Sequence, residues 1–118
     1  MKEQNAGIQI VGVEPATSAV LSSGEKGSHG IQGIGAGFIP SILNTDIIDE
    51  VVTVSTKEAY EACRIFARRE GILVGITSGA ALHTAGMLAK RPENAGKTIV
   101  ALLPDSGDRY MSLPLFTD

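Results

Sequence analysis

Short apolar segments alternate with amphipathic segments along this chain of 118 residues, and that order constrains the fold more than any other feature. Apolar runs rich in β-branched residues at 8–13, 51–54 and 98–103 predict buried strands, and a further apolar stretch lies at 72–76. Strands that are separated by helices usually form a parallel sheet with helices packed on its faces. We therefore predict an α/β fold, a three-layer arrangement of a parallel sheet with helices on both faces. The run at 98–103 contains no polar residue after Thr98, so we place it at the centre of the sheet.

Two of the helices are predicted with defined ends. Ser55 and Glu58 have the spacing of a capping box, apolar residues then recur every three or four positions, and Gly71 stops the helix. Residues 80–90 predict a second helix, which ends before Pro92.

The segment between the first two predicted strands is less regular. Residues 16–21 predict a short helix and residues 38–43 a short helix or turn. Six glycines fall within residues 22–37. So many glycines indicate a loop with special backbone angles or a close approach to a ligand.

Composition excludes several classes of function. The net charge is −3, which gives no electrostatic reason to bind nucleic acid. The single cysteine, Cys63, cannot form an internal disulfide, and no apolar run is long enough to span a membrane. The polar N-terminus does not resemble a signal peptide, so we expect a cytoplasmic protein. No paired histidines or cysteines have the spacing of a metal site.

Two turns follow predicted strands, at 77–79 and 104–107, and ligands of parallel sheets gather at the carboxyl ends of strands. The hydroxyl of Thr77 or Ser78 could cap the following helix or could face a ligand at the helix N-terminus. In the second case, the small residues Gly79, Ala80 and Ala81 would let a flat ring approach.

The remaining candidates are weaker. Residues 32–37 superficially resemble a dinucleotide-binding loop, but the spacing is wrong and no strand precedes them. They are either a flexible connector or a loop whose amides face a carboxylate or a cofactor. His83 and Cys63 are interpreted as packing residues. His29 lies in the glycine-rich loop, and Asp105 with Asp108 and Arg109 could form a salt-bridged turn or part of a site.

Several segments together resemble one enzyme family. They are the sequences VGVEP at 11–15, HGIQGIGAGFIP at 29–40, EGILVGITSGAA at 70–81, LPDSGDRY at 103–110 and PLF at 114–116. In order and spacing they resemble the cysteine synthases, also called O-acetylserine sulfhydrylases, which belong to the fold type II, or tryptophan synthase β-like, pyridoxal-phosphate enzymes. One small departure is that relatives commonly have proline at Ser28 and lysine at Gly30.

The resemblance implies a function and a site. The family makes L-cysteine and acetate from O-acetyl-L-serine and sulfide by β-elimination and replacement on pyridoxal 5′-phosphate. Thr77 is placed to hydrogen-bond the pyridine nitrogen, with Ser78 as the neighbouring candidate. Pro104 and Asp105 are expected to flank the nitrogen edge of the ring. The residues expected near substrate are Gln32, Gly33 and Gly35.

The resemblance also implies what to expect of the chain as a whole. Residues 1–118 would be the C-terminal part of a two-domain subunit, and the Schiff-base lysine, the asparagine-bearing substrate loop and the phosphate-binding loop would lie upstream. The lysines that match none of the catalytic lysine's context are Lys2, Lys26, Lys57, Lys90 and Lys97. We therefore assign no catalytic residue, and expect the chain alone to be inactive and to bind the cofactor weakly or not at all.

Partners and alternatives follow from the same resemblance. The expected partners are the missing N-terminal half or another copy of this chain, because the missing half would leave apolar surface exposed. The C-terminal tail of serine acetyltransferase is a further possible partner, which would make the chain a non-catalytic binding module. Within the enzyme class, the alternatives are cystathionine β-synthase and O-phosphoserine sulfhydrylase.

Overall fold

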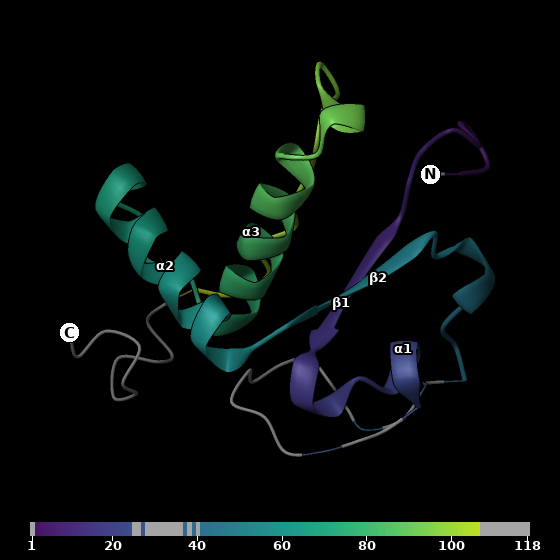
Figure 1. Cartoon of the computed structure of the whole chain (residues 1–118), viewed down its shortest axis with the longest axis horizontal. Helices are drawn as coiled ribbons and strands as arrows, with labels where there is room; N and C mark the ends of the chain where they lie inside the picture. Colours follow the sequence, from purple (N-terminus) through teal and green to yellow (C-terminus); the bar gives the residue numbers. More distant parts are fainter. Residues whose placement is uncertain (1, 25–26, 28–36, 38, 40, 107–118) are drawn as a thin grey trace.

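The computed structural model describes residues 2–24, 27, 37, 39 and 41–106 and shows a small α/β arrangement (Figure 1). Two strands lie beside one another, and the two long helices stand in a V against them. The strands are β1 (Val11–Pro15) and β2 (Glu50–Val54), and the α-helices are α1 (Val20–Ser23), α2 (Thr56–Glu70) and α3 (Ile76–Ala89). Short 3₁₀ turns occur at η1 (Ala16–Ser18), η2 (Thr45–Ile47) and η3 (Pro92–Asn94).

The two strands pair in parallel, which confirms the predicted α/β class with parallel strands. The register runs from Val11 opposite Glu50 to Pro15 opposite Val54. Both strands carry side chains toward the helices, and Val52 and Val54 of β2 are buried. The described residues show a two-stranded sheet, so they do not reach the three layers that the sequence predicts.

Helix α2 has the ends that its sequence predicts. The Ser55 hydroxyl accepts a hydrogen bond from the Glu58 amide at 3.1 Å, and the Ser55 amide donates to the Glu58 carboxylate at 2.9 Å. Gly71 ends the helix in the left-handed region, at φ 69°. Local signals fix both ends because each cap is made by residues within one turn of the helix.

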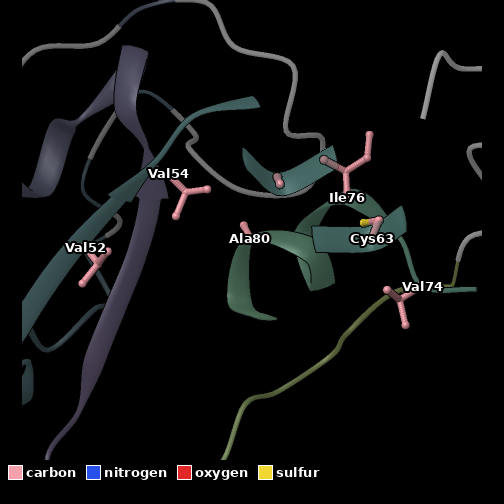
Figure 2. Close-up of a cluster of buried hydrophobic side chains, with 7 residues drawn as sticks. Val52, Val54, Cys63, Val74, Ile76 and Ala80 are labelled. Atoms are coloured by element: carbon pink, nitrogen blue, oxygen red, sulfur yellow. The ribbon is translucent and has the colours of Figure 1, made fainter. Parts of the chain in front are cut away.

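The apolar core lies where α2 and α3 meet β2 (Figure 2). Gly79 of α3 lets the two helices approach closely. A Cβ atom at Gly79 would lie 2.3 Å from the Ala59 carbonyl oxygen and 2.4 Å from Cys63 Sγ. The buried apolar residues of this core are Val52, Val54, Ala59, Cys63, Val74, Ile76 and Ala80.

Residues 98–103 do not form the central strand that the sequence predicts. They run alongside α3 without a ladder partner among the described residues, and the side chains of Val100 and Leu102 are 88% and 79% exposed. Residues 72–76 are not a strand either; Val74 forms one isolated antiparallel bridge to Ser106. A strand exists only where a neighbouring backbone completes its hydrogen bonds. In the part of the chain described, residues 98–103 have no ladder partner, and residues 72–76 have this single bridge.

Other boundaries also differ from the prediction. The first strand begins at Val11 and continues to Pro15, three residues later than predicted at its start. The helix predicted at 16–21 is divided into η1 and α1. Helix α3 begins at Ile76 and not at position 80, because a residue distant in sequence caps its start. Of residues 38–43, positions 38 and 40 lie outside the described residues, and 41–42 form a turn.

None of the described helices combines the length and the apolar character needed to cross a bilayer.

Candidate functional site

A cavity of about 330 Å³ lies between β1, α3 and residues 99–104. Its lining is mostly apolar, and Thr77 and Thr84 bring hydroxyl groups to it. The sequence did not assign Val11 and Val13 of β1 to a site, and the alternation of strand and helix is the signal that could have placed them. The lining residues are Val11, Val13, Thr77, Ala81, Thr84, Ala85, Leu88, Ile99, Val100, Ala101, Leu102 and Pro104.

Thr77 and Pro104 meet at this cavity, although 27 residues separate them in sequence. Thr77 is in the first turn of α3 and is half-buried. Pro104 is exposed and ends the segment that forms the opposite wall. The structure thus brings together two of the four residues predicted to hold the cofactor.

Ser78 and Asp105 are also brought together, but they face one another. The side chain of Ser78 is fully buried, and its hydroxyl is hydrogen-bonded to the Asp105 carboxylate and lies 3.1 Å from the Asp105 carbonyl oxygen. The Ser78 amide donates to Oδ1 of Asp105 at 3.0 Å. Ser78 does not line the cavity, and of these two neighbouring hydroxyl residues Thr77 is the one that does.

Asp105 caps helix α3, which corrects the expectation that Thr77 or Ser78 does so. The N-cap residue is Gly75, whose side chain offers no acceptor. The Asp105 carboxylate meets the third amide of the helix instead, and its carbonyl accepts from the Gly75 amide at 3.1 Å. Helix N-termini leave amide donors unsatisfied and favour negative charge, so a carboxylate from elsewhere can replace a local cap.

The small residues at the start of α3 have different roles. Gly79 and Ala80 face α2 and the core, and neither lines the cavity. Ala81 does line it. The expectation that all three let a flat ring approach is therefore wrong for Gly79 and Ala80, because helical geometry turns successive residues by about 100° around the axis.

Cys63 is the core residue that the sequence predicts. Its thiol is fully buried and donates to the Gly75 carbonyl at 3.1 Å. Burial, followed by the negative charge of Asp105, raises the pKa of the Cys63 thiol to about 11. A thiol with this pKa remains protonated at neutral pH and is a poor nucleophile.

A second hollow, of about 750 Å³, separates the outer faces of α2 and α3. In it Nε2 of His83 lies 3.1 Å from a carboxylate oxygen of Glu58. The sequence analysis predicted a satisfied packing role for His83 and did not predict this pair. The Ser55 amide and hydroxyl, followed by the charge of His83, lower the pKa of the Glu58 carboxyl.

None of the lysines that the structure describes lines the cavity with Thr77. Lys2 forms an ion pair with Asp49 at 2.8 Å, and Lys57 and Lys90 line the hollow between α2 and α3. Lys97 is exposed after η3, and Lys26 is outside the described residues. The other predicted residues outside the described part are His29, Gln32, Gly33, Gly35, Asp108 and Arg109.

Comparison with known proteins identifies the family. The family model described as "Pyridoxal-phosphate dependent enzyme" matches residues 1–105. The chain belongs to this family. Cysteine synthase of Staphylococcus aureus is 49% identical over 117 residues, which are 99% of this chain and 37% of that protein. The chain thus spans little more than a third of the curated relatives it matches.

Solved structures of related enzymes support the same family assignment. The crystal structure of cysteine synthase from Entamoeba histolytica matches with a TM-score of 0.96 and 46% identity, over 99% of this chain and 35% of that one. An O-acetylserine-dependent cystathionine β-synthase from Helicobacter pylori matches with a TM-score of 0.86 and 39% identity, over 98% of this chain and 37% of that one. The resemblance to cysteine synthases is therefore confirmed: the chain corresponds to part of such an enzyme.

The residues present fit one edge of the family's cofactor. The Thr77 hydroxyl and the ring of Pro104 reach the same cavity, and a hydroxyl can hydrogen-bond a pyridine nitrogen. The lining within the described residues contains no cationic side chain for a phosphate and no amine. The fit is therefore to the nitrogen edge of the ring and to nothing beyond it.

Proposed function

We propose that this chain is the C-terminal part of a cysteine synthase and supplies the wall of the cofactor site that holds the pyridine nitrogen. In the complete enzyme the reaction converts O-acetyl-L-serine and sulfide into L-cysteine and acetate. The family membership and the 49% identity to a cysteine synthase support this proposal. The observation that carries it is the half-buried Thr77 beside Pro104, with Ser78 turned away.

We propose that Thr77 and Asp105 have different roles at this wall of the cofactor site. The Thr77 hydroxyl offers the ring nitrogen a neutral partner, which does not force a proton onto it. Asp105 directs Oδ1 to Ser78 and the helix amide, and we propose that it flanks the ring's edge while fixing the turn that carries Thr77. Pyridoxal phosphate, when bound, supplies an electron sink for β-elimination and replacement.

The same proposal defines what the 118 residues contribute. They form the C-terminal portion of a two-domain fold type II subunit, in which a parallel sheet has helices on both faces. The catalytic lysine and the phosphate-binding loop belong to the remaining part of the fold. We further propose that Gln32, Gly33 and Gly35 take part in substrate binding in the complete enzyme. Alone, the chain is inactive and binds the cofactor weakly or not at all.

The experiment is a visible absorption spectrum of the purified chain with pyridoxal phosphate, followed by borohydride reduction and mapping of any labelled lysine. We expect no stoichiometric band from the chain alone. We then add the segment of Staphylococcus aureus cysteine synthase that does not align with this chain. The mixture should show the absorption band of a lysine-bound cofactor and should form cysteine. A stoichiometric label on one lysine of the isolated chain would overturn the proposal.

Thr77 variants test the role of the hydroxyl in the combined protein. Thr77→Ser keeps the hydroxyl and should keep the spectrum and the turnover. Thr77→Val keeps the shape and loses the hydroxyl, so we expect turnover to fall by about tenfold or more. Equal turnover of both variants would show that the Thr77 hydroxyl has no role in the cofactor site.

One further enzymatic function is favoured by a particular observation. The match to a cystathionine β-synthase supports a related β-replacement activity, and O-phosphoserine sulfhydrylase belongs to the same class. Assays of the combined protein with sulfide and O-acetyl-L-serine, and with other thiols or O-phospho-L-serine, separate these activities. A non-catalytic module would instead retain a peptide of the serine acetyltransferase tail in a pull-down with the isolated chain.

A further inference from the structure

The first turn of α3 is enclosed by the protein everywhere except at one residue. Every residue from 74 to 80 is buried apart from Thr77, which is half-buried and lines the cavity of about 330 Å³. Its neighbours in sequence, Ile76 and Ser78, are both completely buried. The place of the Thr77 hydroxyl is therefore determined by the contacts that hold the turn from outside the cavity.

Two parts of the chain hold this turn through the backbone of Gly75. The Gly75 amide donates to the Asp105 carbonyl at 3.1 Å, from the turn after residues 98–103. The Gly75 carbonyl accepts the first hydrogen bond of the helix, from the Gly79 amide at 3.0 Å. The same carbonyl also accepts the thiol of Cys63 in α2, at 3.1 Å. Helix α2 thus contributes a side-chain donor to the residue two positions before Thr77.

The sulfur of Cys63 also packs against the backbone at Gly79. A Cβ atom at Gly79 would lie 2.4 Å from Sγ, so the backbone of α3 lies directly against the sulfur. The thiol is completely buried with Val74 and Ile76 in the apolar core (Figure 2). It therefore touches the turn on both sides of Thr77, two residues before it and two residues after it.

These contacts are more specific than packing requires. A residue that only fills space in a core needs volume, which an apolar side chain supplies as well as a thiol does. The Cys63 thiol has volume and also directs a donor at a buried carbonyl. Its contacts are with the one turn that brings a hydroxyl to the cavity, and Cys63 itself does not line that cavity.

We propose that Cys63 is a positioning residue for Thr77, an inference that rests on the proposed function. Through Gly75 and Gly79, the thiol sets where the Thr77 hydroxyl lies relative to the ring nitrogen in the complete enzyme. Cys63 does not touch the cofactor and exchanges no proton with it. Its effect on the reaction passes through the backbone of α3, because side chains that support a site from behind fix its geometry.

Loss of the sulfur should move the turn. Cys63→Ala removes the donor and leaves a void beneath the backbone at Gly79, and a core relaxes only partly into such a void. A misplacement of about 1 Å at a site can reduce a rate by about 100-fold. Cys63→Ser keeps a donor at the same position in nearly the same volume, so it should restore the position of the turn.

Amide hydrogen exchange of the 118-residue chain tests the contact without any cofactor. We expect Cys63→Ala to speed exchange of the Ser78 and Gly79 amides by about tenfold more than its loss of overall stability, measured by urea unfolding, accounts for. Cys63→Ser should stay close to the unaltered chain. Val52→Ala is the control, because Val52 belongs to the same core but lies on β2, away from Cys63 (Figure 2). Its exchange should follow overall stability.

The chain combined with the remaining segment of the Staphylococcus aureus enzyme tests the effect on the reaction. We expect Cys63→Ala to lower kcat by about threefold or more and to leave the KM for O-acetyl-L-serine unchanged, because the substrate does not contact this residue. Cys63→Ser should recover most of the kcat. Val52→Ala should keep the kcat of the unaltered protein at temperatures well below unfolding.

Three results would overturn the positioning role. They are exchange in Cys63→Ala that follows overall stability, equal behaviour of Cys63→Ser and Cys63→Ala, and an equal loss of kcat in Cys63→Ala and Val52→Ala. A normal cofactor band and normal turnover with Cys63→Ala would contradict this role and leave the proposed function intact. If the unaltered combined protein shows no band and forms no cysteine, the proposed function fails. The exchange measurement alone then decides whether Cys63 fixes the turn.

Discussion

Two carboxylates, Glu14 and Asp105, each satisfy the amides of a helix that begins elsewhere in the chain. Glu14 is buried and accepts hydrogen bonds from the Leu21 and Ser22 amides of α1 at 2.7 and 2.9 Å. Asp105 does the same for α3 through the Ser78 amide. Both lie beside a proline at the carboxyl end of an extended segment. Hydrogen bonds to these two carboxylates thus hold the start of each helix at the carboxyl end of an extended segment.

Removal of the Asp105 carboxylate tests how much its hydrogen bonds to the start of α3 stabilise the fold. Asp105→Ala should lower the free energy of unfolding by about 1–2 kcal/mol, because a helix amide and the buried Ser78 hydroxyl lose their acceptor. Urea unfolding measures it. Glu93→Ala, at an exposed position in η3, is the control and should change stability by less than about 0.5 kcal/mol. An unchanged midpoint for Asp105→Ala would show that water replaces the cap.

Cys63 gives a prediction for alkaline pH. Its folded pKa, about 11, is above the ordinary value of 9.0, so burial of the neutral thiol stabilises the fold below pH 9. That contribution is lost as pH rises from 9 through 11, because the unfolded thiol ionises first. The difference in unfolding free energy between the unaltered chain and Cys63→Ala should therefore shrink over this range. A difference that is constant from pH 8 to 11 would contradict the buried neutral thiol.

At the scale of elements, the contact between α2 and α3 depends on one missing side chain. Gly79→Ala places a methyl group against the Ala59 carbonyl and Cys63 Sγ and should cost about 1–3 kcal/mol of stability. Gly86→Ala on the same helix is the matched control, since its Cβ would meet nothing within 4 Å. There alanine should stabilise by about 0.5–1 kcal/mol. Thermal unfolding of both variants measures whether stability falls for Gly79→Ala and rises for Gly86→Ala. A change of stability in the same direction for both variants would contradict the close packing at Gly79.

The elements also show what the sequence can predict. Helix α2 is predicted to the residue because Ser55, Glu58 and Gly71 act locally. The start of α3 is not predictable in this way, because its acceptor is 27 residues further along the chain. Residues 98–103 have the composition of a central strand, but the state of a strand depends on its neighbours. Within the described residues those neighbours are absent.

The candidate site was predictable to a similar degree. The carboxyl-end rule for parallel sheets brings the turns at 77–79 and 104–107 together, and the structure places Thr77 and Pro104 on one cavity. Sequence alone left Thr77 and Ser78 as alternatives. The choice depends on which of the two hydroxyls is hydrogen-bonded to Asp105, and only the three-dimensional structure shows that it is Ser78.

At the scale of the whole molecule, the described part exposes much apolar surface for its size. Ile42 is 94% exposed, and Val100 and Leu102 are nearly so. Large apolar side chains that are exposed in this way often mark a surface that contacts another part of a protein or another chain. We therefore expect the isolated chain to associate with itself.

Charged substitutions test that association. The double change Val100→Lys and Leu102→Lys should reduce self-association of the isolated chain, because lysines on an open edge oppose pairing. Sedimentation velocity over a range of concentrations measures it. Ile72→Lys, at a 54% exposed position away from the cavity, is the control and should leave association unchanged. A clean monomer of the unaltered chain at all concentrations would contradict the prediction.

The bond between Asp105 and Ser78 has a consequence for the order of events on the ribosome. Synthesis proceeds from the N-terminus, so the first turn of α3 emerges 27 residues before the carboxylate that caps it. Until then the turn that carries Thr77 has no side-chain acceptor at its N-cap. The nascent chain would therefore complete α2 first, from its own local caps, and would fix the turn that carries Thr77 among the last of its described parts.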